Sequence, residues 1–283
     1  MAQPDQKATN ENIEVKSDVT LATELISSGA EITGSAAGAA IGLLGGPIGV
    51  IGGAVAGAVI GRVLAKVGAE IQKRVLGPRE HLRMGAVAGY AGSAIKAGLD
   101  SGKALRSDGF FDADVTGRSK ADELLEGVLQ KARDAYEEKK LPYLGTLYAQ
   151  LAFHPEVSAR YGGYLIQLAG DLTYTQYVAL VLGSENPSSR LRTKDFRGDT
   201  VALAALDNEA TGLLLEIYDL YQRGLAHGGD GSAWLSVPDV SPGSFKVQAA
   251  GVLLVELMGL RAIPESDKKV FYDAFPSMPI EST

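Results

Sequence analysis

The feature that most constrains this fold is a run without any charged side chain, from Ile32 to Gly61, which contains ten glycines. Most of them fall into two registers spaced by four residues, Gly34, Gly38, Gly42 and Gly46, then Gly49, Gly53, Gly57 and Gly61. Residues four apart share one face of a helix, so each register predicts a helix with a stripe free of side chains. Such a stripe lets another backbone approach closely, which is how helices pack in membranes.

The run is too long for one simple span. Thirty helical residues measure about 45 Å, against a hydrocarbon core of about 30 Å. The sequence Gly45-Gly46-Pro47 predicts the end of one helix and the start of another. We therefore expect two short helices, about 32–45 and 47–67, folded as a hairpin.

Two other interpretations of the run remain open. It is either a close-packed core element of a soluble protein or a flexible glycine-rich loop. Glycine in a water-exposed helix costs about 1 kcal/mol relative to alanine, so a helical run needs a bilayer or tight helix contacts. The regular spacing disfavours the loop.

Charge is distributed unevenly around the run. Residues 1–31 carry six acidic and two basic side chains, residues 62–106 carry nine basic and three acidic, and residues 107–283 carry 25 acidic and 16 basic. An acidic flank, an uncharged run and a basic flank are typical of membrane topology. Five bases are expected at lipid head groups, with a solvated helix face as the alternative: Arg62, Lys66, Lys73, Arg74 and Arg79.

Composition excludes several classes of function. A net charge of −7 disfavours a nucleic-acid partner. The absence of cysteine excludes disulfides, thiolate metal sites and a cysteine nucleophile. The first residues contain no basic stretch followed by an apolar one, so we expect no secretory signal peptide. The expected location is the cytoplasmic side of a membrane, or exchange between solution and membrane.

The predicted fold class is all-α, organised as three segments. Residues 1–30 are expected to be polar and largely disordered, 31–68 to form the glycine-zipper hairpin and 69–283 to form a multi-helix domain. Small residues recur at spacing four in the next stretch, at Gly85, Gly89, Ser93 and Ala97. This stripe predicts close packing on another helix, and the hairpin is the nearest candidate.

Further helices are predicted by capping and periodicity. Ser119 with Asp122 and Thr173 with Gln176 have the spacing of capping boxes. The first box precedes an expected apolar face made of Leu125, Val128, Leu129, Ala132 and Tyr136.

Prolines and apolar spacing predict the remaining elements. Pro142 is expected to break the chain ahead of a short helix over 143–153, and Pro155 to be the first residue of the next helix. A long helix is expected over 201–225. Strand-like stretches at 234–237 and 244–247 predict a small two-strand element near 233–247.

One stretch resembles a calcium loop. Its oxygen-bearing side chains occupy loop positions 1, 3, 5 and 12, at Asp112, Asp114, Thr116 and Glu123. It departs from that pattern because Ser119 replaces an apolar residue and Gly109 interrupts the entering helix. An acidic turn followed by a capped helix explains the same residues, so we expect no metal.

Other chemistry is poorly supported. The segment 98–104 is one residue short of a phosphate loop, and His81, His154 and His227 are too far apart for metal-ligand spacing. No nucleophile elbow is present. We therefore expect no catalytic residues and no cofactor.

The glycine registers over 34–61 resemble the glycine-zipper segments of bacterial membrane proteins and membrane-active toxins. That resemblance implies close helix packing in or at a membrane. The layout, an apolar segment joined to a helical body, is similar to that of bacterial toxins and abortive-infection effectors. It favours a pore-forming effector that inserts the hairpin into a lipid bilayer as a homo-oligomer.

Two other functions remain as alternatives. One is a non-toxic, membrane-anchored scaffold whose acidic region 107–283 recruits a protein partner. The other is a soluble enzyme that uses the hairpin as core.

Overall fold

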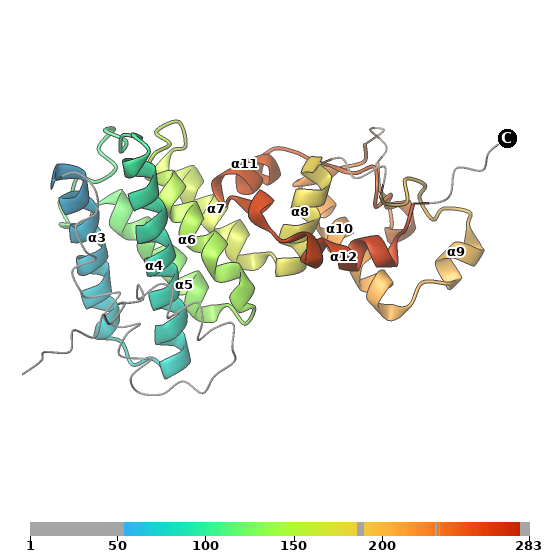
Figure 1. The fold of residues 1–283 in the computed structure, drawn as a ribbon, viewed down its shortest axis with the longest axis horizontal. Coiled ribbons are helices and arrows are strands. Elements are labelled where there is room, and N and C mark those ends of the chain that lie inside the picture. The colour runs from blue at the N-terminus through green and yellow to red at the C-terminus, as the bar shows by residue number, and fades with distance from the viewer. Residues whose placement is uncertain (1–53, 186–189, 230, 232, 278–283) are drawn as a thin grey trace, which may run out of the picture.

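The computed structural model describes residues 54–185, 190–229, 231 and 233–277. These residues form ten α-helices and one antiparallel sheet of two short strands (Figure 1). The all-α fold class with a small strand element is confirmed. The first predicted helix, 32–45, lies outside the described residues, and the division into segments 1–30, 31–68 and 69–283 stays a prediction.

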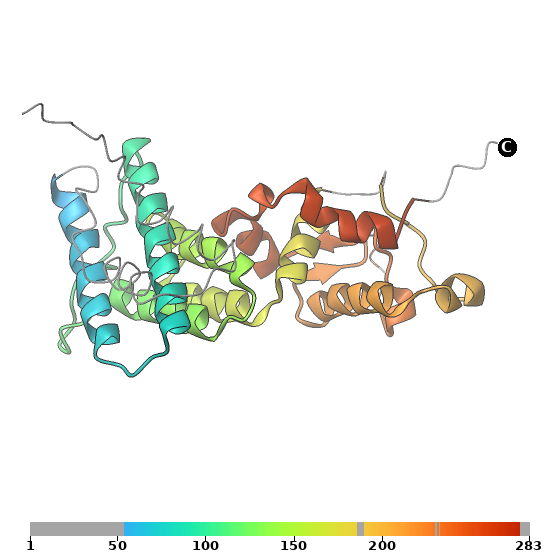
Figure 2. The same cartoon turned by 60° about the horizontal axis from the view of Figure 1, so that its bottom comes forward.

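The helices form an elongated molecule with two ends (Figures 1 and 2). One end is a bundle of five: α3 (Ala54–Gln72), α4 (Pro78–Asp100), α5 (Lys120–Asp134), α6 (Leu141–Leu151) and α7 (Ala159–Asp171). Within it α3 is an edge helix that packs on α5, whereas α4 packs on α5 and α6.

The other end contains the remaining elements: α8 (Tyr174–Glu185), α9 (Thr200–Ala204), α10 (Asn208–Gln222), β1 (Ala226–His227), β2 (Lys246–Val247), α11 (Ala250–Leu257) and α12 (Glu265–Ala274). Short 3₁₀ turns lie at Glu138–Lys140, Val237–Asp239 and Leu260–Ala262. Helix α11 contacts α6 and α7 as well as α8, so it joins the two ends.

Helix α4 packs most closely on α6, through a glycine of α6. A Cβ atom at Gly145 would lie 2.7 Å from the Cβ of Tyr90 and 2.8 Å from the carbonyl oxygen of Val87. Gly85 and Gly89 of the predicted small-residue stripe are buried, whereas Ser93 and Ala97 are exposed. The α6 contact uses the backbone of Val87 and the start of the Tyr90 side chain. Val87 lies on the side of α4 opposite Gly85 and Gly89, so the helix that packs on the stripe stays a prediction.

Local capping signals are confirmed. Ser119 Oγ accepts the Asp122 N–H at 3.1 Å, and the Asp122 carboxylate accepts the Ser119 N–H at 2.9 Å. Thr173 and Gln176 exchange the equivalent pair of bonds at 3.0 Å. Each box satisfies two amides that a helix start leaves without intrahelical partners. On α5 the predicted apolar face is buried except for Tyr136, which is 77% exposed because the helix ends before it.

The short helix expected after Pro142 forms as α6, but the positions predicted for both prolines are wrong. Pro142 lies in the first turn of α6 rather than in a break. That position suits proline because its missing N–H has no intrahelical acceptor there. Helix α7 starts later than Pro155, at Ala159, because the Ser158 hydroxyl caps it by accepting the Tyr161 N–H at 3.2 Å.

The single helix expected over 201–225 is also wrong. Asp207 has an extended backbone, and its carboxylate accepts the Ala210 N–H at 2.8 Å. It therefore caps α10 and separates that helix from α9.

The small sheet uses a different partner from the one expected. The strand at 246–247 lies inside the predicted region, but it pairs with β1, with Ala226 opposite Val247. The stretch 234–237 is not a strand: Trp234 is buried against the Tyr221 ring, with centroids 5.1 Å apart, and a 3₁₀ turn follows.

Candidate functional site

Most of the predicted zipper residues lie outside the described part of the chain. These are Gly34, Gly38, Gly42, Gly46, Pro47, Gly49 and Gly53. The last two of the second register, Gly57 and Gly61, lie on α3. This helix continues past the expected end at residue 67, so the described part of the zipper is the first half of a longer helix.

Helix α3 has one fully apolar face, and that face is buried. Its members are at most 3% exposed: Ile60, Val63, Leu64, Val67 and Ile71. They belong to the same core cluster as the bundle helices. At about 100° per residue they form a single stripe, so α3 is amphipathic and docked by its apolar side.

The side of α3 that carries Gly61 is open. Within the described residues, no atom lies within 4 Å of where a Cβ at Gly61 would stand. This predicted zipper position therefore makes no close helix contact with the described part of the chain.

A row of charged side chains joins α3 to the start of α5. The Arg62 guanidinium donates to the carbonyl oxygen of Phe111 at 3.0 Å. Lys66 Nζ lies 2.8 Å from the carboxylate of Asp122, whose side chain is only 6% exposed. Together with the ion pairs of Arg118 with Glu70 and Glu126 and of Arg74 with Glu126, these contacts form the α3–α5 ion-pair row.

The second half of the row has a central arginine. Arg118 contacts Glu70 at 3.1 Å and Glu126 at 2.6 Å. Glu126 also accepts from Arg74, whose backbone N–H closes the turn that ends α3 by donating to Ile71. Lys66, Glu70 and Arg74 thus each pair with an oppositely charged side chain. These partners lie on α5 or in the loop before it.

The row perturbs the titration of its most enclosed glutamate. Burial alone would raise the pKa of Glu126, but hydrogen bonds from Arg74 and Arg118 outweigh it and hold the pKa below the ordinary 4.5. The carboxylate is therefore bound more strongly in its charged form. Among the described residues one donor of the row, Arg118 Nε, is buried without a partner.

The remaining predicted head-group residues behave differently. Lys73 is exposed. Arg79, in the first turn of α4, pairs with Glu138 at 2.7 Å, and Arg83 binds the same carboxylate at 3.2 Å. Four of the five predicted cations therefore bind acceptors of the helical body, and they are not simply solvated.

The calcium-loop candidate forms a turn. Asp114 Oδ1 accepts the backbone N–H and the hydroxyl of Thr116 at 2.8 and 2.6 Å, which lowers the pKa of Asp114. Asp112 and Glu123 are exposed. Across the described ranges, no three acidic or histidine side chains are placed to hold a metal ion.

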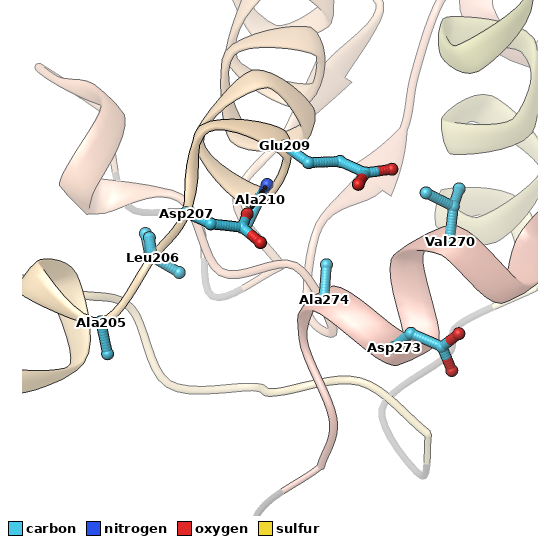
Figure 3. Close-up of a pocket in the computed structure, with 8 residues that line it drawn as sticks. All are labelled: Ala205, Leu206, Asp207, Glu209, Ala210, Val270, Asp273 and Ala274. Carbon is cyan, nitrogen blue, oxygen red and sulfur yellow. Dashed lines mark hydrogen bonds between the residues drawn. The ribbon is translucent and has the colours of Figure 1, made fainter.

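A separate hollow of about 320 Å³ lies between the α9–α10 connection and the end of α12 (Figure 3). Two of its three acidic residues have structural roles: Asp207 caps α10, and Asp273 pairs with Lys269. The hollow includes none of the residues predicted from the sequence.

Three residues of the ion-pair row were missed by sequence reasoning: Glu70, Arg118 and Glu126. The four-residue spacing of Arg62, Lys66 and Glu70 already indicates one charged helix side. The residues that pair with this charged side lie about fifty residues further along the chain. The spacing of charges within one helix carries no information about such distant partners.

In the part of the chain that the structure describes, no helix has the length and apolar character that crossing a bilayer requires. Comparison of the chain with models of protein families, with curated proteins and with solved structures gives no match in any of the three.

Proposed function

We propose that this protein is a membrane-active helical effector whose resting fold stores α3 on the helical body. The observation that carries the proposal is the position of α3. It is an edge helix that continues the glycine-zipper registers, and an apolar face and the α3–α5 ion-pair row hold it in place. In this proposal α3 leaves the body at a bilayer, where the zipper positions pack between copies of the chain and permeabilise the membrane.

The magnitudes indicate what must drive release. Burial of a large aliphatic side chain stabilises by about 1.5–3 kcal/mol, so the five on α3 contribute on the order of 10 kcal/mol. Partly exposed ion pairs contribute at most about 1 kcal/mol each, and the side chains of Lys66 and Arg74 are 33% and 36% exposed. Exposure of the apolar face to water is therefore the dominant cost, and a bilayer removes it by accepting that face.

A covalent lock tests the proposal. The chain has no cysteine, so Lys66→Cys with Asp122→Cys introduces one pair that a disulfide-containing bismaleimide can bridge. We expect the bridged protein to stop releasing dye from vesicles, and reductant to restore release. The control is Lys96→Cys with Asp100→Cys, which replaces an exposed ion pair within α4 and leaves α3 unattached.

Two results would contradict the proposal. Leakage that is equal with and without the α3–α5 bridge would mean that α3 does not leave the body. No leakage by the unmodified chain under any lipid or pH condition would rule out a permeabilising effector.

The burial of α3 favours a second candidate, a membrane-anchored binding protein. In that function α3 stays docked, only residues preceding it contact the membrane, and the acidic region 107–283 recruits a protein partner. Membrane binding without leakage, unaffected by the α3–α5 bridge, would support it.

A further inference from the structure

We infer that Arg62 and Lys66 of α3, with Arg74 of the turn that ends it, form a binding site for anionic lipid head groups. In the resting fold, oxygen atoms of Phe111, Asp122 and Glu126 occupy this site. The inference rests on the proposed function and names the ligand and the regulation of α3. In this view the body's own carboxylates act as the competitor of lipid phosphates.

The segment that contains α3 and the segment that contacts it carry opposite net charges. Residues 54–74 carry four basic and one acidic side chain, a net charge of +3. Residues 111–126 carry five acidic and two basic side chains, a net charge of −3. A segment with this net charge that leaves such a partner is attracted to another anionic surface.

Phosphate can replace the oxygen atoms that these three cations contact. Arg62 donates to a carbonyl oxygen, and Lys66 and Arg74 bind carboxylates of Asp122 and Glu126. Phosphate oxygens accept the same charge-assisted hydrogen bonds from guanidinium and ammonium groups. Exchange of one carbonyl and two carboxylates for phosphate oxygens therefore preserves the bonding of all three cations.

An anionic bilayer is the source of phosphate that suits α3 best. When α3 leaves the body, its buried apolar face needs an apolar medium as well as an anionic one. Free phosphate and nucleic acid offer charge alone, whereas an anionic bilayer offers both. Helix α3 has a buried apolar face and basic side chains on its other sides, and an amphipathic helix of this kind lies in the membrane interface.

The helix geometry suits that orientation. Counted at about 100° per residue from Ile60, Leu64 and Val67, the side chains of Arg62 and Lys66 project to the flank and back of the apolar face. With the apolar face in the acyl region, both cations point toward the head groups, where long basic side chains are stabilised.

The test measures flotation of the full-length chain with vesicles of phosphatidylcholine alone or mixed with phosphatidylglycerol. Glu126→Gln weakens the internal competitor, and we expect it to bind the mixed vesicles about fivefold more tightly than the unmodified chain. Glu123→Gln, an exposed carboxylate of the same helix turn, is the matched control and should bind unchanged. Lys66→Gln removes one cation and should weaken binding to mixed vesicles only.

Circular dichroism verifies that each variant is folded. A general loss of stability would change binding in the same direction for Glu126→Gln and Lys66→Gln, whereas we expect opposite directions. Equal binding of Glu126→Gln and Glu123→Gln would overturn the inference. So would binding to neutral vesicles that matches binding to mixed ones. Loss of α3 hydrogen-exchange protection with inorganic phosphate alone would also overturn it, because free phosphate would then be the ligand.

Leakage separates this inference from the proposed function. Charge-dependent binding without dye release supports the lipid site and contradicts the permeabilising effector. Dye release that is unaffected by Glu126→Gln and Lys66→Gln contradicts the lipid site and leaves the effector standing.

Discussion

Gly61→Ala is expected to stabilise the resting fold. Gly61 lies inside α3, and no described atom would be within 4 Å of the added methyl group. Replacement of glycine by alanine in a helix interior gains up to about 1 kcal/mol, because alanine loses less backbone entropy. For a chain of this size such a gain raises Tm by about 2–4 °C.

The matched control is Gly145→Ala, the same substitution at a packed position. There the new methyl group would lie 2.7 Å from the Cβ of Tyr90 and 2.8 Å from the carbonyl oxygen of Val87. Neither atom is the end of a flexible side chain, so the helices must separate. We expect a loss of about 1–3 kcal/mol, measured with the first variant by urea unfolding followed at the helical circular-dichroism band.

The two glycines therefore make opposite predictions for one chemical change. A decrease in the free energy of unfolding for Gly61→Ala would refute the reasoning, because it would mean that this face of α3 is packed in the resting fold. A second variant addresses the membrane: Gly61→Leu adds a side chain too large for close backbone contact. We expect it to lower vesicle leakage while the protein stays folded.

Three further outcomes follow from the same contacts. Arg106 donates to three backbone carbonyls from a buried position, so Arg106→Ala should lower the free energy of unfolding in urea by about 3 kcal/mol. A loss below about 1 kcal/mol would contradict this. Ser119→Ala removes the cap of α5 and should lower the free energy of unfolding by about 1 kcal/mol. An unchanged urea midpoint would argue against the cap. Because Arg74 and Arg118 hold the pKa of Glu126 below 4.5, its contribution is present above pH 4.5 and is lost as pH falls through the lowered value. Glu126→Gln should therefore flatten the decline of unfolding free energy at acidic pH, measured by urea unfolding across a pH series; an unchanged decline would contradict the role of this carboxylate.

Local features were predictable from the sequence. The capping boxes at Ser119 and Thr173 require only a hydroxyl and an acceptor three residues later, and both form. The apolar face of α5 follows from spacing alone. Tyr136 was placed on it wrongly because periodicity does not show where a helix ends.

Features that depend on distant segments were not predictable. The helix expected over 201–225 has continuous apolar spacing, and only the conformation of Asp207 interrupts it. Likewise, the pairing of β1 with β2 joins strands about twenty residues apart across a turn region. The cations at Arg62 and Lys66 were noticed, but their partners on the 111–126 segment depend on how α3 docks.

Asp122 gives the docking of α3 an effect on a second helix. Its carboxylate accepts the Ser119 N–H of the capping box and also binds Lys66 of α3. Departure of α3 removes a cation from the carboxylate that holds the first turn of α5 and exposes that turn to solvent. The first turn of α5 should therefore lose amide-exchange protection together with α3, so that the two helices open as one cooperative unit.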